Sequence, residues 1–199
     1  MQPKSKQQLL PLQSQSQFTL TSFIHTEFDI HSLAKKLINS NDPQQILFQG
    51  VSGSGKTHLL QSLCHFGYQK GLRCQYWPLQ SLSEGLDQLV EGCEQCNILC
   101  LDDIHYSMGN TSQERSLFNL INRCHMSDTH IIFSSQQRLD TLSCQLPDLK
   151  SRLLGMLYQP LKLIKDNERL TALKLRTTEA GIHIPTITLE SILKHSPSN

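Results

Sequence analysis

Residues 50–57 have the sequence Gly50-Val51-Ser52-Gly53-Ser54-Gly55-Lys56-Thr57, which satisfies the pattern G-x-x-x-x-G-K-[ST] without a mismatch. Glycines in this pattern let the backbone curl so that successive N–H groups point at phosphate oxygens, and the following helix adds its positive N-terminal end. Lys56 would contact the β- and γ-phosphates, and Thr57 would offer a hydroxyl group to Mg²⁺. Such a match arises by chance at about one in 10⁴ to 10⁵ positions. The alternative is a glycine-rich turn that merely joins two elements.

The surroundings of this loop have the expected strand–loop–helix order. A short apolar run at residues 46–48 predicts a buried strand before it, and a helix should follow from Thr57 to about Lys70, ended by Gly71. The spacing of apolar residues predicts further strands at 74–77, 97–101 and 130–133, and further helices at 31–38 (with Asp29 as a cap), 82–90, 113–125 and 166–180. Strands that alternate with helices predict an α/β fold, in which a parallel sheet is flanked by helices.

A second motif is the apolar run 97–101 followed by two acidic residues, Asp102 and Asp103. A carboxylate at the end of the strand beside the phosphate loop can hold Mg²⁺ through water, which is the role expected of Asp102. Asp103 could polarise an attacking water molecule. An apolar strand that ends in two aspartates is common, so the motif gains its weight from the phosphate loop upstream.

Four ordered segments carry a resemblance to a known family, and they are Thr21-Ser22-Phe23, Gly53-Ser54-Gly55-Lys56-Thr57-His58-Leu59-Leu60, Leu101-Asp102-Asp103-Ile104 and Leu146-Pro147-Asp148-Leu149-Lys150-Ser151-Arg152-Leu153. The chain resembles the DnaA/Hda branch of the AAA+ proteins. The resemblance implies a P-loop NTPase (AAA+) fold, a bound ATP or ADP with Mg²⁺, ADP favouring the active form, and His58 as part of the nucleotide site. It also implies that Arg152 is an arginine finger that acts in trans on a neighbouring subunit's γ-phosphate. The alternative for Arg152 is a surface arginine that caps a helix.

Within this branch, two features favour the Hda-type regulators over the DnaA initiators. The chain is short and has no evident C-terminal helix-turn-helix domain for binding DNA. Its first residues include Gln7, Leu10, Pro11 and Leu12, similar to the peptide with which Hda-type proteins bind the DNA polymerase sliding clamp (the β subunit). In such a peptide, apolar side chains enter a pocket and the glutamine hydrogen-bonds at its edge. The alternative is a glutamine-rich leader with incidental leucines.

The expected organisation has three parts: residues 1–17 as a disordered tail, 18–160 as the AAA+ nucleotide-binding domain, and 161–199 as a truncated C-terminal helical lid. The chain departs from the family at three points. Gln136 stands where relatives have an acid, and Phe28 stands about where relatives have an asparagine near the base. The lid is expected to stop before the segment that carries the family's sensor-2 arginine, which would leave no lid cation over the phosphates.

The composition excludes several classes of protein. The formal net charge is +1, with scattered lysines and arginines, so specific DNA binding is not expected. We expect neither a membrane span nor a secretory signal, and we therefore expect a cytoplasmic protein whose seven cysteines are mostly reduced, with a metal site at the cysteines as a minor alternative.

The leading hypothesis is a clamp-tethered regulator that promotes hydrolysis of DnaA-bound ATP. An autonomous helicase-loader-like ATPase and a non-catalytic adaptor between clamp and DnaA remain open, as does assembly into a homo-oligomer.

Overall fold

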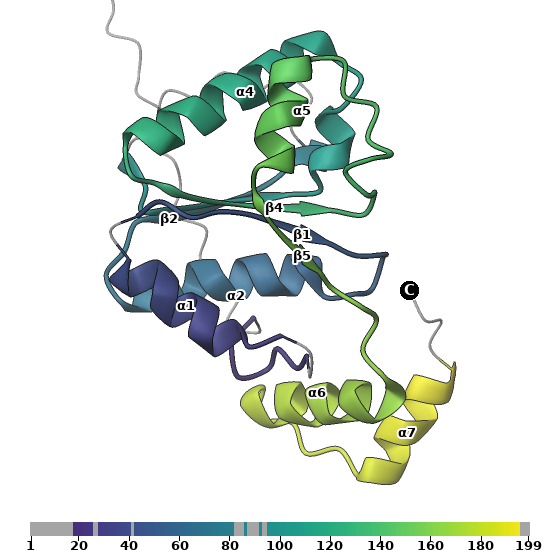
Figure 1. Cartoon of the computed structure of the whole chain (residues 1–199). Helices are drawn as coiled ribbons and strands as arrows, with labels where there is room; N and C mark the ends of the chain where they lie inside the picture. The colour runs from purple at the N-terminus through teal and green to yellow at the C-terminus, as the bar shows by residue number, and fades with distance from the viewer. Residues whose placement is uncertain are drawn as a thin grey trace, which may run out of the picture.

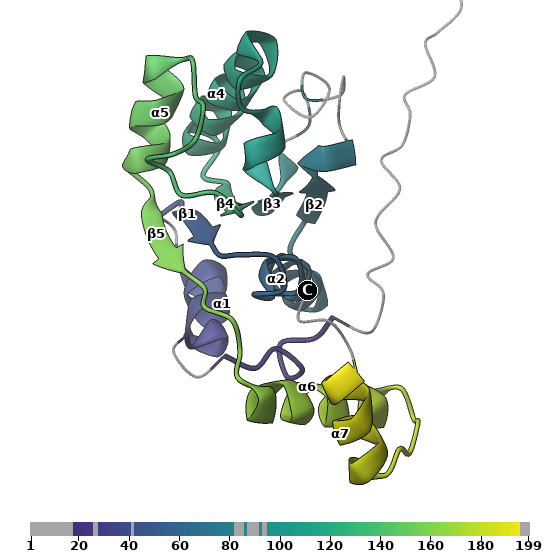
Figure 2. The same cartoon turned by 90° about the vertical axis from the view of Figure 1, so that its right-hand side faces the viewer.

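A parallel five-stranded sheet forms the centre of the molecule, in a computed structural model that describes residues 18–25, 28–40, 42–81, 86, 92 and 95–195. Its strands are β1 (Gln45–Gln49), β2 (Cys74–Pro78), β3 (Ile98–Asp102), β4 (His130–Ser135) and β5 (Leu157–Pro160). They lie in the order β2-β3-β4-β1-β5, and every neighbouring pair is parallel. Figure 2 shows this order, with β5 at one edge beside β1. The predicted α/β fold class is confirmed.

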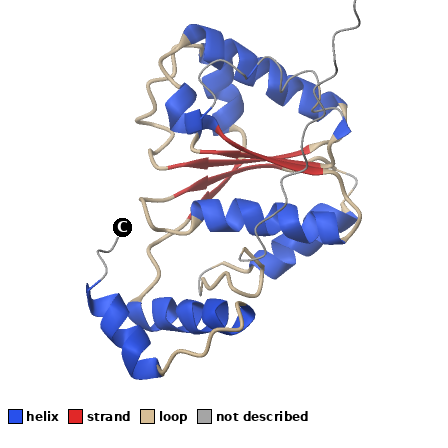
Figure 3. Ribbon diagram, turned by 180° about the vertical axis from the view of Figure 1, so that it is seen from behind, coloured by secondary structure: helices blue, strands red, loops and turns tan. Residues whose placement is uncertain are grey.

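Helices cover both faces of the sheet (Figure 1). One face carries α1 (Ile30–Asn39) and α2 (Lys56–Gln69), and the opposite face carries α4 (Thr111–Met126) and α5 (Pro147–Leu154). Two further helices, α6 (Asp166–Glu179) and α7 (Thr186–His195), lie beyond the layer of α1 and α2, away from the sheet (Figure 3). The short 3₁₀ turns η1 (Leu79–Ser81) and η3 (Ile104–Ser107) follow β2 and β3. No helix in the described ranges is both long and apolar enough to cross a membrane.

Local signals in the sequence explain where several helices begin and end. The Asp29 carboxylate accepts the N–H of Ser32 at 3.1 Å and caps α1, as predicted. At the end of α2, Gly71 has φ +80°, and Leu72 N–H donates to the Gly67 carbonyl at 3.0 Å. A left-handed glycine with this backward hydrogen bond terminates a helix because it satisfies otherwise unpaired carbonyls.

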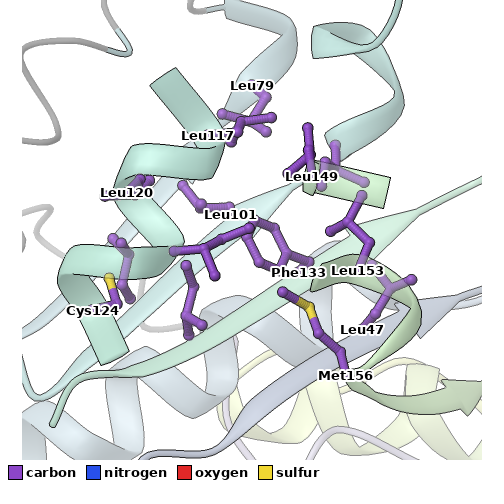
Figure 4. Packing of buried hydrophobic residues seen from close by; sticks show 14 of the residues in the cluster. Leu47, Leu79, Leu101, Leu117, Leu120, Cys124, Phe133, Leu149, Leu153 and Met156 are labelled. Atoms are coloured by element: carbon purple, nitrogen blue, oxygen red, sulfur yellow. The ribbon is translucent and has the colours of Figure 1, made fainter. Parts of the chain in front are cut away.

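Alternate residues of each central strand face opposite layers, which produces two hydrophobic clusters. Leu47, Leu101 and Phe133 pack under α4 and α5, whereas their neighbours in each strand pack against α1 and α2. Figure 4 shows the first cluster, in which side chains of α4, α5 and the sheet meet. A parallel sheet buried on both faces requires continuous apolar strands, as β3 and β4 have.

The structure also contains two α-helices and one strand that the sequence patterns did not predict, namely α5, α7 and β5. Strand β5 contains exposed Leu157 and Tyr158 and ends at Pro160, so it lacks the apolar run of the central strands. The predicted helix 82–90 lies almost entirely outside the described residues, as does the tail 1–17.

Candidate nucleotide-binding site

The phosphate-binding loop (P-loop, residues 50–57) connects the end of β1 to the start of α2. Gly53 and Gly55 have φ +79° and +88°, in the left-handed region that favours glycine. No side chain caps the N-terminus of α2, so its first-turn N–H groups are available to an anion. The Lys56 ammonium donates to the carbonyls of Gly50 and Val51 at 2.8 and 3.0 Å. This arrangement fits a phosphate group.

Two details of the loop explain its residue types. A Cβ atom on Gly50 would lie 2.4 Å from the Leu161 carbonyl oxygen and 2.4 Å from Ser54 Oγ, so only glycine fits. Ser54 is 1% exposed, and its Oγ has no hydrogen-bond partner within the described part of the chain. A buried hydroxyl without a partner is costly, and a phosphate oxygen could satisfy it.

Asp102 lies at the end of β3 and accepts three side-chain hydroxyl groups. Thr57 and Tyr76 each donate to Asp102 Oδ2 at 2.7 Å, and Ser134 donates to Asp102 Oδ1. Asp102 is 3% exposed, and these bonds fix its orientation toward the P-loop threonine. A carboxylate and a hydroxyl at this separation are oxygen ligands of the kind that Mg²⁺ takes, directly or through water. The predicted pairing of Thr57 with Asp102 is therefore present, and the donor set fits the metal.

Asp103 follows with φ +59°, which is uncommon outside glycine. Its N–H donates to Ser134 Oγ at 2.8 Å, and its carboxylate lies 3.8 Å from His105 Nδ1. Burial, followed by the charge of Asp102, raises the pKa of Asp103, while His105 and other neighbours oppose the shift. Asp103 Oδ1 is buried without a hydrogen bond to any described residue. A raised pKa and an open oxygen suit a group that polarises water.

A cavity of about 240 Å³ lies between the P-loop, the N-terminal segment 22–24 and the helices α6 and α7. Apolar side chains, including Phe23 and Leu173, supply much of its lining, which suits a flat aromatic base. Two arginines of α6, Arg169 and Arg176, also line it, as do the P-loop glycines Gly53 and Gly55. Helix α6 therefore contributes two cations to the cavity wall, whereas the expected lack of a lid cation over the phosphates stays a prediction. The pair is seven residues apart, a spacing that puts both side chains on one face of a helix.

His58 joins the three parts that surround this cavity. Its Nδ1 receives a hydrogen bond from Arg176 Nη2 at 2.7 Å, and its Nε2 lies 3.2 Å from Ser22 Oγ and 3.3 Å from the Thr19 carbonyl oxygen. Because His58 is 8% exposed, burial and then the charge of Arg176 lower its pKa to about 4. The imidazole is therefore neutral at pH 7, with Nδ1 as the acceptor. Thus the histidine after the P-loop connects α2 to the N-terminal segment and to α6.

Of the other candidate site residues that the sequence singled out, none that the structure describes lines this cavity. Arg152 is exposed on α5, on the face of the sheet opposite α2 (Figure 1). Phe28 packs its ring on Phe48, with centroids 5.4 Å apart, and is not among the residues that line the cavity. Gln136 donates its backbone N–H toward His105 Nδ1 at 3.5 Å. Its side chain hydrogen-bonds to Asp103 and partly opposes the rise in the pKa of that carboxyl group. The clamp-binding peptide, with Gln7, Leu10, Pro11 and Leu12, lies outside the described residues.

The structure thus brings the P-loop residues, His58, Asp102 and Asp103 together, as the motifs indicated. Sequence reasoning missed Tyr76, Ser134, Arg169 and Arg176. The seven-residue spacing of the two arginines could have indicated that they share one face of a helix. Tyr76 and Ser134 reach Asp102 from separate strands, and only the strand order places them there.

Comparison with known proteins identifies similar sequences and folds. The model of the bacterial DnaA ATPase domain matches residues 15–159. An uncharacterised protein of Haemophilus influenzae is 32% identical over 184 residues, which cover 90% of this chain and 79% of that protein.

Solved structures with similar folds include domain III of the replication initiation protein DnaA from Thermotoga maritima, with a TM-score of 0.75, 24% identity, and coverage of 89% of this chain and 80% of that chain. AMPPCP-bound DnaA from Aquifex aeolicus gives a TM-score of 0.72 at 22% identity and 92% coverage of this chain. This chain spans 61% of the length of the Aquifex chain. The likeness establishes the P-loop AAA+ fold.

Proposed function

This chain belongs to the family of the bacterial DnaA ATPase domain, and from that premise we propose that it is an Hda-type regulator. In this proposal it binds ATP or ADP with Mg²⁺ at the P-loop, is tethered to the sliding clamp, and makes DnaA hydrolyse its bound ATP. Replication initiation would be restrained as a result. The position of Arg152 is the observation that carries the proposal.

The position of Arg152 supports a role on another molecule. Strand β5 runs parallel to β1, with Leu157 opposite Ile46, so β5 begins where β1 begins. Helix α5 ends at Leu154, close to that end of the sheet, whereas the P-loop follows the other end of β1. The Arg152 side chain is exposed and makes no hydrogen bond or ion pair with any described residue. A free guanidinium remote from its own nucleotide site fits a finger that stabilises transition-state charge in a partner.

The surface beside Arg152 has the character of a protein contact. Leu154, Leu157 and Tyr158 are 58%, 56% and 40% exposed. Strand β5 pairs only with β1, so its outer edge is not covered by another described strand. Adjacent exposed apolar side chains on a soluble protein favour association, and the arginine would be brought to the partner's nucleotide with them. We propose DnaA as this partner.

The nucleotide bound in this chain would have a structural role. Lys56 and the α2 amides would bind phosphate, Thr57 and Asp102 would hold Mg²⁺, and the cavity would take the base and ribose. A bound Mg²⁺ would neutralise phosphate charge. The cavity is bounded by the P-loop, the N-terminal segment and α6, so a nucleotide there would stabilise all three together. The support for clamp binding is the sequence of residues 7–12, which resembles a clamp-binding peptide.

The test is hydrolysis of radiolabelled ATP prebound to DnaA, with and without this protein and a DNA-loaded clamp. The proposal predicts clamp-dependent loss of ATP, abolished by Arg152→Ala and by deletion of residues 7–12. Arg115→Ala is the matched control, because Arg115 is an exposed arginine on another helix, α4. Full stimulation by Arg152→Ala would refute the finger assignment.

A second candidate is an autonomous ATPase, which the assembled set of Lys56, Thr57, Asp102 and Asp103 favours. It predicts ATP turnover by the purified protein alone that Lys56→Ala removes. Turnover no greater than that of Lys56→Ala would eliminate this candidate. If the protein binds both clamp and DnaA without speeding ATP loss, it is instead a non-catalytic adaptor.

A further inference from the structure

Glu114 of α4 is a completely buried acidic residue outside the nucleotide site, with 0% of its surface exposed. Its Oε1 accepts the N–H groups of Gly109 at 2.8 Å and Gln145 at 3.0 Å. Its Oε2 accepts those of Gln145 at 2.9 Å and Leu146 at 2.7 Å. Burying a carboxyl group is costly unless it is well hydrogen-bonded, and hydrogen bonds to a carboxylate are stronger than neutral ones. Glu114 therefore holds two separate loops firmly.

The first of these loops leaves the nucleotide site. It begins at Asp103, passes through η3, and ends at Gly109, whose φ of +81° turns the chain toward α4. The second loop, residues 142–146, leads directly into α5. The two loops also contact each other, because Gln145 Nε2 donates to the Gly109 carbonyl at 3.1 Å. Glu114 is thus the common acceptor of the loop after Asp103 and the loop before α5.

The second loop determines where the Arg152 helix begins. Leu146 is the N-cap residue of α5, and its side chain cannot satisfy an N–H group. Pro147 follows at the first helical position, which favours initiation there. Leu149 and Leu153 are 0% and 1% exposed, so α5 is also packed on the core. A short helix fixed at its start and along one face holds in place the backbone from which its exposed side chains project.

We propose that Glu114 is the positioning residue for Arg152. It fixes the start of α5 to the loop that follows Asp103, so that the trans-acting arginine stands at a constant place relative to this chain's own nucleotide site. The inference rests on the proposed function of Arg152. The buried Glu114 carboxyl group would touch neither the nucleotide at this chain's P-loop nor the partner's ATP. Through Arg152 it would nevertheless control the rate at which the partner's ATP is hydrolysed.

Glu114→Gln tests this in the clamp-dependent DnaA assay. The variant keeps the shape of the side chain but presents an NH₂ group to an N–H donor. We expect the maximal rate of stimulated hydrolysis to fall about 10- to 100-fold, the loss typical of a catalytic group displaced by about 1 Å. The concentration of protein that gives half-maximal stimulation, and its affinity for ADP, should not change. Glu190→Gln, an exposed glutamate on α7, is the matched control.

A double-mutant cycle separates positioning from a general structural effect. If Glu114 acts through Arg152, Glu114→Gln should slow stimulated hydrolysis less in an Arg152→Lys background, which keeps the positive charge, than in the wild type. Amide hydrogen exchange supplies a readout independent of activity. Exchange at Gly109, Gln145 and Leu146 should accelerate about 10- to 100-fold in Glu114→Gln, as expected when hydrogen bonds to a charged acceptor are lost. Exchange in the P-loop helix should not change.

Should Glu114→Gln fail to fold, Glu114→Asp is the second variant, because it keeps the charge but is one methylene too short to reach both loops. It should lose stimulation with intact ADP binding. A wild-type maximal rate in either folded variant would overturn the inference, as would unchanged exchange at the three amides. An equal loss in the Arg152→Lys background and in the wild type would also overturn it. If wild type itself fails to stimulate DnaA, the proposed function fails, and the inference fails with it.

Discussion

Gly50→Ala should destabilise the protein and weaken its nucleotide binding, because the first P-loop glycine lies against Leu161, the residue that follows β5. The new Cβ would lie 2.4 Å from the Leu161 carbonyl oxygen, a backbone atom that cannot rotate away. Overpacking of this kind costs about 1–3 kcal/mol. In a chain of this length that corresponds to a fall in Tm of about 2–12 °C. The Gly50 carbonyl also accepts the Lys56 ammonium at 2.8 Å, so displacement of Gly50 should disturb the phosphate site.

The matched control is Gly71→Ala, which affects the other end of α2. A Cβ on Gly71 meets nothing within 4 Å, but its φ of +80° penalises any other residue. The cost is about 1 kcal/mol, near the lower end of the range for Gly50→Ala. Both variants should therefore be less stable than the wild type, but only Gly50→Ala should also bind nucleotide more weakly.

Thermal unfolding with and without ADP and Mg²⁺ separates the two effects. Ligand at about 100 times its Kd should stabilise the wild type and Gly71→Ala by about 2.7 kcal/mol. Gly50→Ala should be stabilised by no more than about half as much, about 1.4 kcal/mol, because titration with a fluorescent ADP should give an affinity at least about 10-fold weaker than wild type. Wild-type affinity in Gly50→Ala would refute this account of the P-loop and its contact with Leu161.

Three further predictions concern the site. The folded-state pKa of His58, about 4, lies below its ordinary value of 6.5, so its contribution to stability is complete above pH 6.5 and is lost as the pH falls toward 4. This loss is on the order of 3 kcal/mol. Urea unfolding should show that the free energy of unfolding depends less on pH in His58→Gln than in the wild type, and an equal pH dependence would contradict the prediction. Tyr76→Phe removes a 2.7 Å hydrogen bond to Asp102 and should raise the Mg²⁺ concentration for half-maximal nucleotide binding about 3- to 10-fold, unlike Tyr68→Phe at an exposed site; equal Mg²⁺ dependence would refute it. Arg176→Ala should weaken ADP binding about 10-fold by removing a cation from the cavity, and unchanged affinity in a titration would refute that role.

The sequence predicted the elements whose signals are local. The apolar runs of β1, β3 and β4 and the strand–glycine–helix order around Lys56 are properties of short windows, and all are found in the structure. Asp29 and Gly71 mark helix ends for the same reason, because a cap depends on the residue and its near neighbours.

The parts that the sequence did not predict depend on long-range placement. Tyr76 and Ser134 both bond to Asp102 only because β2 and β4 flank β3. The buried Glu114 resembles an ordinary polar helix residue until loops from two distant segments converge on it. Strand β5 is stabilised by its register with β1 rather than by its own composition.

Equilibrium binding of a fluorescent ADP, with and without Mg²⁺, measures whether the P-loop holds the nucleotide on which every proposed activity depends. The account predicts saturable, Mg²⁺-dependent binding by the wild-type chain. It also predicts an affinity at least about 10-fold weaker in Lys56→Ala, whose ammonium is lost from the phosphate site. Absence of binding by the wild type, or equal binding by Lys56→Ala, would contradict the assignment of this site.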